Sequence, residues 1–266
     1  MENSAIEKQK ARPLRLLGGM FVRPRSTFEA IHETGRRSWW LPALLAALMV
    51  VLPIVVGAPL RAQQQREAVA AVQEQFGEDV SPEQREQMEQ AVRVATSPLL
   101  ITVFPSVAAL VGLAVGWLVW AGTLYLTGMA IGSHASFGAL FRTVVWAWIP
   151  YAVRGLLQSL YILVSGRLIS NPGLSGLVYD AQSVREALAA PPTPGQMVAA
   201  AFLGRVDLFL FWNLALLVVG TAVVTRLSTR KAMALVLGIW LLLTGISLLP
   251  TLISSLFMRG TGIFGG

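Results

Sequence analysis

The sequence predicts an all-α polytopic membrane protein, a bundle of five transmembrane helices. Hydrophobic residues make up 55% of the chain, and its mean hydropathy is +0.62. Five apolar runs each reach the roughly 20 residues that a helix needs to cross a ~30 Å hydrocarbon core. The runs are continuous, whereas the strands of a membrane barrel alternate between apolar and polar residues. A transmembrane β-barrel is therefore excluded.

Spans and connections alternate along the chain. The predicted order is a cytoplasmic segment 1–38, span one 39–60, an external helical hairpin 61–97, span two 98–132, a cytoplasmic turn 133–139, span three 140–165, an external loop 166–195, span four 196–226, a cytoplasmic turn 227–231, span five 232–257 and an external tail 258–266. The first 38 residues lack the short apolar core and cleavage site of a signal peptide. We therefore expect the first span to serve also as the insertion signal.

The distribution of charge predicts the orientation in the membrane. Segment 1–38 contains eight Lys or Arg against four Glu, whereas 61–97 contains four Arg against seven acidic residues. Because Lys and Arg are enriched on the cytoplasmic side, the N-terminus is expected inside and the C-terminus, after five crossings, outside. The net charge of +7 is then mainly a topology signal. Its basic residues are scattered without interleaved aromatics, which argues against a nucleic-acid partner.

Two polar segments outside the spans have helical patterns. Pro13–Val22 forms a basic amphipathic stretch suited to the headgroup layer, and a second short helix after Pro24 is expected to turn Phe28 and Ile31 inward. Segment 61–97 predicts two helical arms, the second beginning at Ser81-Pro82 and ending near residue 95. The alternative for 61–97 is a disordered loop. As a hairpin, it is the surface that we expect to recognise a protein partner.

Span two contains small residues four positions apart, a spacing that lets helices approach closely. They are Ala108, Gly112 and Gly116, with Gly128 and Gly132 nearer the cytoplasmic end. We expect these residues to pack inside the bundle. Contact between two copies of the chain, and hence a homo-oligomer, is the alternative. Pro105 in this span and Pro150 in the third predict kinks, because proline lacks the N–H that a helix needs.

The residues that membrane enzymes require are missing from the spans. The chain has no cysteine, and its two histidines, His32 and His134, lie outside the apolar runs. A Ser–His dyad or a metalloprotease of the HExxH type would need histidine within a span. No glycine-rich phosphate loop is present. We therefore expect no catalytic residue, no metal site and no bound cofactor.

A small polar set inside the third and fourth spans is the best candidate for a site. Its members are Arg154, Gln158, Arg205, Asp207 and Asn213. An unpaired arginine in the bilayer centre costs about 2.5–3.5 kcal/mol, so Arg154 should find an acceptor on the fourth helix, with Asn213 or Asp207 the first candidates. We interpret the set as a polar clamp between the two helices. The alternative is the lining of an anion or proton path. Arg205 is expected to extend to the outer headgroups.

Two stretches resemble the Yip (Ypt-interacting protein) family. Residues 21–31, Phe-Val-Arg-Pro-Arg-Ser-Thr-Phe-Glu-Ala-Ile, resemble the segment that leads into the first span of bacterial members. Residues 136–142, Ser-Phe-Gly-Ala-Leu-Phe-Arg, with Ala-Trp-Ile-Pro-Tyr at 147–151, look like the family's short cytoplasmic turn and third helix. The resemblance implies a structural or trafficking membrane protein with five spans. Eukaryotic relatives are associated with small GTPases and vesicle membranes, and some bacterial relatives with ABC-type export.

These observations together favour a non-catalytic role. We expect a scaffold or accessory subunit of a membrane complex, such as an ABC-type exporter, in the inner (plasma) membrane of a bacterium. Its partners would be the lipid bilayer and a protein bound through the hairpin 61–97. The alternative is a small transporter or channel with a polar path around Arg154. One acidic residue in the spans and no apparent inverted repeat make ion-coupled transport the weaker interpretation.

Overall fold

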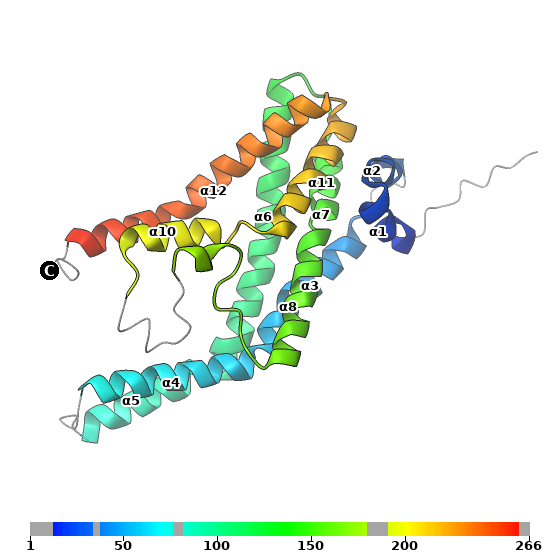
Figure 1. The fold of residues 1–266 in the computed structure, drawn as a ribbon. Coiled ribbons are helices and arrows are strands. Elements are labelled where there is room, and N and C mark those ends of the chain that lie inside the picture. The colour runs from blue at the N-terminus through cyan, green and yellow to red at the C-terminus, as the bar shows by residue number, and fades with distance from the viewer. Residues whose placement is uncertain (1–12, 34–37, 77–81, 180–190, 261–266) are drawn as a thin grey trace, which may run out of the picture. The chain divides into compact units, whose positions relative to one another are not determined.

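The computed structural model describes residues 13–33, 38–76, 82–179 and 191–260, which fold into helices joined by short connections (Figure 1). No strand occurs among these residues. In sequence order the helices are α1 (Pro13–Val22), α2 (Pro24–Glu33), α3 (Trp40–Val56), α4 (Ala58–Phe76), α5 (Pro82–Ala95), the π-helical turn η1 (Leu99–Val103), α6 (Phe104–Ala130), α7 (Phe137–Ala147), α8 (Ile149–Ser165), the 3-10 turn η2 (Ser175–Leu177), α10 (Pro194–Leu203), α11 (Leu208–Thr225) and α12 (Thr229–Gly260). The predicted all-α membrane class is confirmed.

Four spans in the described part of the chain are long and apolar enough to cross a membrane: Leu99–Ala130, Phe137–Ser165, Leu208–Thr225 and Thr229–Ser255. A fifth arises if α3 and the first part of α4 count as one broken span, because the two helices meet at a bend of 44°. The predicted count of five therefore depends on this bend.

The bend between α3 and α4 is held by a side chain from α4. The Arg61 guanidinium donates to the carbonyl oxygens of Ile54, at 2.9 Å, and of Pro53, at 3.4 Å. Both carbonyls belong to the last turn of α3, where the helix dipole favours a cation, and Pro53 O also accepts the Gly57 N–H at 3.1 Å. Arg61 thus stabilises the end of one helix from the start of the next.

Prolines interrupt two further helices near the places that the sequence predicts. Pro105 is the second residue of α6, which follows directly on the π-helical turn Leu99–Val103. Pro150 lies at the start of α8, and Trp148 separates α7 from α8 with an N–H bonded to Val145 O, one residue closer than in an α-helix. Both interruptions have the same cause, since the proline ring removes a donor and displaces the carbonyl four residues earlier.

The fourth apolar run differs from the single span 196–226 that the sequence suggests. It forms two helices, α10 and α11, separated by residues 204–207. The helix α10 begins with a reciprocal capping box formed by Thr193 and Gln196. With only ten residues, α10 extends ~15 Å and is too short to cross a bilayer. Only α11, with 18 residues, is left as the fourth span.

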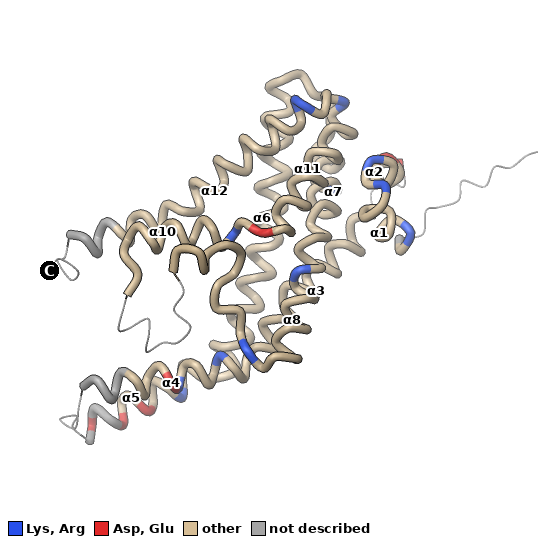
Figure 2. The backbone as a smooth tube through the Cα atoms, in the orientation of Figure 1, with Lys and Arg blue, Asp and Glu red and all other residues tan. Residues whose placement is uncertain are grey.

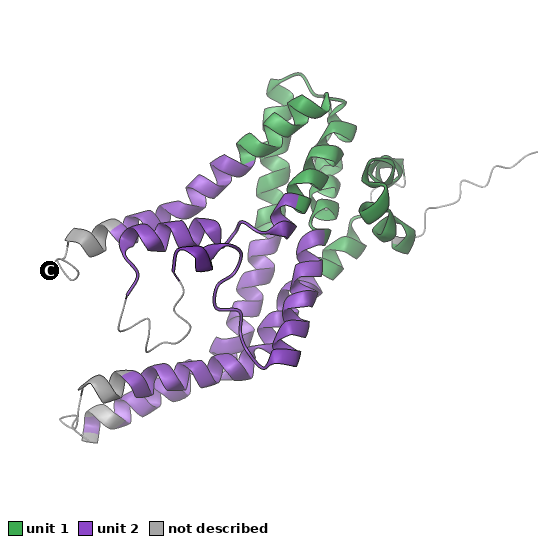
Figure 3. Ribbon diagram, in the orientation of Figure 1, with its two compact units in different colours: residues 1–46, 115–149, 212–239 green, residues 47–114, 150–211, 240–266 purple. Residues whose placement is uncertain are grey.

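The chain divides into two compact units (Figure 3). The first contains residues 1–46, 115–149 and 212–239. Here α2 packs on α7, and its Phe28 and Ile31 are fully buried, as the sequence predicts. The spacing of Ser26 and Glu29 suggests a capping box that starts this helix, but Ser26 is not its cap, because α2 already begins at Pro24. A Cβ atom on Gly220 of α11 would lie 2.9 Å from the Phe28 ring, so this glycine permits the close approach.

The second unit contains residues 47–114, 150–211 and 240–266. Its α4 and α5 run side by side and form the predicted helical hairpin (Figure 1). Basic and acidic residues both occur along this hairpin, whereas α6 has none over its whole length (Figure 2). The unit also contains α8, α10 and the break between α10 and α11.

Candidate functional site

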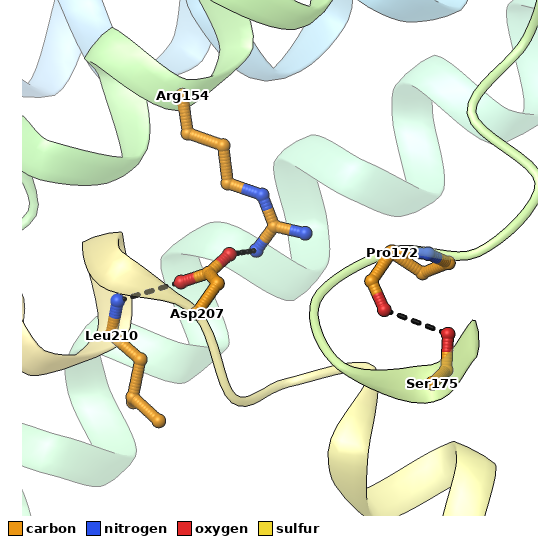
Figure 4. Close-up of polar contacts among 5 residues, drawn as sticks. All are labelled: Arg154, Pro172, Ser175, Asp207 and Leu210. Atoms are coloured by element: carbon orange, nitrogen blue, oxygen red, sulfur yellow. Dashed lines mark hydrogen bonds and ion pairs between the residues drawn. The ribbon is translucent and has the colours of Figure 1, made fainter. Parts of the chain in front are cut away.

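The break between α10 and α11 brings two of the predicted polar residues together. Asp207 directly precedes α11, and its Oδ1 accepts a hydrogen bond from the Leu210 N–H at 2.8 Å. This is the N-cap geometry, in which a carboxylate satisfies a free N–H of the first helical turn. The other oxygen, Oδ2, lies 2.9 Å from Nη1 of Arg154 on α8 (Figure 4). One carboxylate therefore caps α11 and pairs with a charge on the neighbouring helix.

The ion pair is mostly shielded from solvent. The exposed fraction is 23% for the Arg154 side chain and 15% for that of Asp207. Desolvated charges are stable only as a hydrogen-bonded pair, and removing one partner leaves the other uncompensated. The arrangement is the one expected of a polar clamp between the third and fourth spans.

The loop after α8 packs against the same break. Leu174 N–H donates to Leu203 O, the last carbonyl of α10, at 3.0 Å. The turn itself is closed by Ser175 Oγ, which donates to Pro172 O at 2.7 Å (Figure 4). Gly173 has φ +59°, and a Cβ on it would lie 2.7 Å from Leu203 O. Both the conformation and the close approach require glycine here.

The break also changes the relative depth of the polar residues. Counting along one continuous helix places Asp207 ~9 Å further out than Arg154. The ion pair instead places the two groups at one level. Since α11 starts directly after Asp207 and is ~27 Å long, the pair lies at the end of the fourth span rather than within it.

Asn213 binds a different partner from Arg154. Its Nδ2 donates to Ala147 O at 2.8 Å, and the side chain is 2% exposed. Ala147 is the last residue of α7, so its carbonyl is one of those that a helix end leaves without a backbone donor. A side-chain amide thus satisfies the helix break at Pro150. Both the polar residue and the proline were predicted from the sequence, but the bond that connects Asn213 to this break was not.

The remaining two members of the predicted set lie apart from the pair. Arg205 Nη1 donates to Ser247 Oγ on α12, so in this structure its guanidinium binds a neighbouring helix rather than extending to headgroups as expected. Gln158 lies one turn beyond Arg154 on α8 and is half-buried. Ser247, which the sequence did not single out, in turn donates to Thr244 O within its own helix.

The small residues of the second span do not pack as expected. Ala108 and Gly112 are exposed, and no described atom would lie within 4 Å of a Cβ on Gly112 or Gly116. Gly128 is buried only against Ser133 in the following turn, and Gly132 has φ +84° just after the end of α6. The last two are therefore explained by the turn that ends the helix.

The close helix contact occurs elsewhere, at Gly155 on α8. A Cβ there would overlap the carbonyl oxygen of Met49 on α3. Ser159, one turn later, is 1% exposed and donates to Gly155 O at 2.8 Å. These two small residues have the same spacing of four as those of the second span.

Among the described residues outside the spans, His32 is the one whose pKa is clearly shifted by its surroundings. Its Nε2 lies 3.3 Å from Thr143 Oγ1 on α7. Burial, together with the nearby positive charge of Arg142, lowers the pKa of His32 from 6.5 to about 4. It is therefore neutral near pH 7, in a packing position between α2 and α7. Among the described residues, no group of three His, Cys, Asp or Glu side chains could hold a metal ion.

Long apolar helices that contain few charged residues, with Arg154 held in an ion pair, define a polytopic integral membrane protein. The model of the Yip1 domain family matches residues 18–256, and the chain belongs to this family. Comparison with curated proteins and with solved structures gave no match.

Proposed function

We propose that this protein is a non-catalytic scaffold or accessory subunit of a membrane complex, and that the complex is an ABC-type exporter of a bacterial inner membrane. In this proposal the N-terminus is cytoplasmic and the C-terminus outside. The membrane class and the family support it. The main support for the proposal is the hairpin of α4 and α5, because two spans of a bundle can be connected without such a long extension.

One face of α5 has the composition of a recognition surface. Glu83, Glu86, Gln87, Gln90 and Val94 recur at intervals of three and four residues, and all five are exposed. Helical residues at these spacings share one face. The α5 face is therefore acidic at one end and apolar at the other, which suits a partner with a basic patch beside a small apolar surface.

Replacing residues 69–96 by a Gly/Ser linker tests the hairpin. This deletion keeps Arg61, which stabilises the end of α3, and so spares the membrane bundle. We expect the variant to insert into the membrane and to have the same free energy of unfolding as the wild type. It should lose its co-purifying partner, as measured by native-nanodisc purification and mass spectrometry. A partner that is retained in full would show that the hairpin is not the docking element.

Charge variants locate the contact more narrowly. Changing Glu83, Glu86 and Glu89 together to Gln should weaken the complex, while Glu33→Gln on α2, also exposed, is a control on the other predicted side of the membrane. Equal weakening by the control would indicate a general charge effect.

The orientation has a separate test. The chain has no cysteine, so single cysteines can be introduced one at a time. Labelling by a membrane-impermeant reagent should occur at positions 87 and 262 and be blocked at positions 136 and 229. External labelling at position 229 would reverse the orientation and exclude α5 as an external surface.

The break between α10 and α11 favours one alternative, a small transporter or channel. Discontinuous helices with polar side chains at the break form substrate sites in many transporters. Here, however, Arg154 and Asp207 already neutralise each other. Flux through proteoliposomes that contain the purified chain, lost in Arg154→Leu while stability is kept, would favour transport over the scaffold.

A further inference from the structure

A polar groove of about 720 Å³ lies in the second unit, between α4 and the segment that follows α8. One wall is formed by Leu60, Gln63, Gln64 and Glu67 of α4. Their spacing of three and four residues places them on a single face of the helix. This face is separate from the α5 face and from the Arg154–Asp207 pair, so neither accounts for the groove.

The opposite wall is formed by residues 166–171, with Tyr161 of α8 at one end. Gly166 ends α8 with φ +64°, and its N–H bonds to Ile162 O at 3.0 Å. This left-handed turn redirects the chain so that Arg167 and Ser170 line the groove. The wall therefore offers a guanidinium and a hydroxyl opposite the carboxylate and amides of α4.

The two walls carry opposite charges that do not neutralise each other. Among the described residues the ion pairs are Arg25–Glu29 and Arg154–Asp207, and neither includes Glu67 or Arg167. Glu67 accepts from Gln63 Nε2 at 2.9 Å, which orients the carboxylate on its own helix. A ligand with one negative and one positive group could therefore contact both walls at once.

The position of the groove indicates what kind of ligand this is. Its walls begin where two apolar helices end: the span Phe137–Ser165 stops one residue before Gly166, and α4 turns polar just after its bend from the apolar helix α3. Tyr161 and Ile169 are 46% and 40% exposed, and Leu60 and Leu168 complete an apolar margin. Tyrosine beside aliphatic residues is typical of the level of lipid headgroups.

We propose that this groove binds the headgroup of a phospholipid that carries an amine. Arg167 and the amides of α4 contact the phosphate, Glu67 contacts the ammonium group, and the acyl chains lie against Tyr161 and its aliphatic neighbours. An anionic lipid such as phosphatidylglycerol would satisfy Arg167 through its phosphate but offer no cation to Glu67. The groove therefore selects a zwitterionic amino headgroup over an anionic one.

Native mass spectrometry of the full chain tests this selection. The purified protein is titrated with phosphatidylethanolamine and, separately, with phosphatidylglycerol of the same acyl chains. We expect the first to bind more tightly, and Glu67→Gln to reduce its affinity about fivefold and remove the preference. Arg167→Gln should weaken both lipids. Arg66→Gln is the matched control: it also removes one positive charge, from an exposed residue of α4 that does not line the groove, and it should change the affinity for neither lipid.

Three results would overturn the proposal. The first is equal binding of the two lipids by the wild type, and the second is equal weakening by Arg66→Gln and Arg167→Gln, which would indicate general attraction of phosphate. The third is binding of soluble phosphoethanolamine as tightly as the lipid, which would make the ligand a soluble zwitterion. None of these variants alters α5, so the outcome is independent of the proposed complex.

Discussion

The helices α8 and α6 both contain small residues four positions apart, but only α8 uses them for packing. In α8, Gly155 meets the backbone of α3 at Met49, and Ser159 is buried. In α6, Gly112 and Gly116 face open space within the described chain. The most apolar stretch of span Phe137–Ser165 is 33% buried inside the chain, whereas that of Leu99–Ala130 is 0% buried.

The difference teaches that small residues permit close packing without causing it. Lipid tails are as apolar as leucine, so polar groups and short contacts decide which helix face turns inward. Next to Gly155, Arg154 binds Asp207 and so fixes the rotation of α8. In α6 the hydroxyls of Thr123 and Thr127 donate to their own helix, at Val119 O and Thr123 O. The helix α6 contains no charged residue that could determine which of its faces turns toward the rest of the bundle.

The largest effect is expected from reversing the charge that orients α8. Arg154→Glu places two carboxylates together at the start of α11 and should prevent stable assembly, measured as the yield of folded protein after membrane insertion. Arg154→Leu should be milder, with a loss of about 2 kcal/mol in the free energy of unfolding, because leucine suits lipid but Asp207 loses its partner.

A double variant distinguishes the energy of the Arg154–Asp207 ion pair from the contribution of each residue alone. Asp207→Asn keeps an N-cap acceptor for Leu210 while removing the charge. Combined with Arg154→Leu, it should cost less than the sum of the two single changes. Strict additivity would mean that the ion pair does not orient α8.

The next effect concerns the close contact itself. Gly155→Ala should lower the free energy of unfolding by about 1–3 kcal/mol, because its methyl group overlaps the Met49 carbonyl and the two helices must separate. Gly112→Ala makes the same change on α6 and should be neutral or slightly stabilising. Unfolding in mixed micelles compares the two. Equal losses would show that α6 is packed as tightly as α8.

A smaller effect is expected at Asn213, which bonds to the Ala147 carbonyl at the break between α7 and α8. Asn213→Leu removes the bond to Ala147 O and should cost about 0.6–1.7 kcal/mol, the range of interhelical hydrogen bonds in membranes. Asn213→Gln has the same amide one methylene further out and serves as the control. Hydrogen exchange at residues 148–151 should increase in Asn213→Leu. Unchanged exchange would mean that the break is held by other contacts.

Much of the fold follows from the sequence. Apolar length predicts the spans because backbone groups in lipid must bond within a helix. Proline chemistry predicts the interruptions at Pro105 and Pro150. The division of the fourth run was not predictable from mean hydropathy, because the two charged residues of the break, Arg205 and Asp207, are flanked by long apolar stretches on both sides. Asp207 was the available signal, as an N-cap residue before an apolar run.

The polar set was predictable in its members but only partly in its pairs. An arginine in a span needs an acceptor, and Asp207 was one of two candidates. Asn213 and Arg205 instead bind a backbone carbonyl and a serine hydroxyl. Both acceptor types are abundant in every helix, so composition does not select among them. The role of Arg61 was missed, although Pro53 and Gly57 before it indicate a helix end.

The smallest effect on unfolding, within about 0.5 kcal/mol, is expected for Gly112→Leu. Gly112 is exposed and no described atom would lie within 4 Å of the new Cβ, so the side chain starts in open space. The informative measurement is therefore the oligomeric state, by native mass spectrometry in a lipid nanodisc. If Ala108, Gly112 and Gly116 join two copies, leucine at the central position separates the backbones and converts a dimer to a monomer. The matched change Val111→Leu, also exposed on α6, should leave the mass unaltered. An unchanged mass in both variants would assign this face to lipid, and the small residues of α6 would then differ from Gly155 of α8 in facing the bilayer rather than a neighbouring helix.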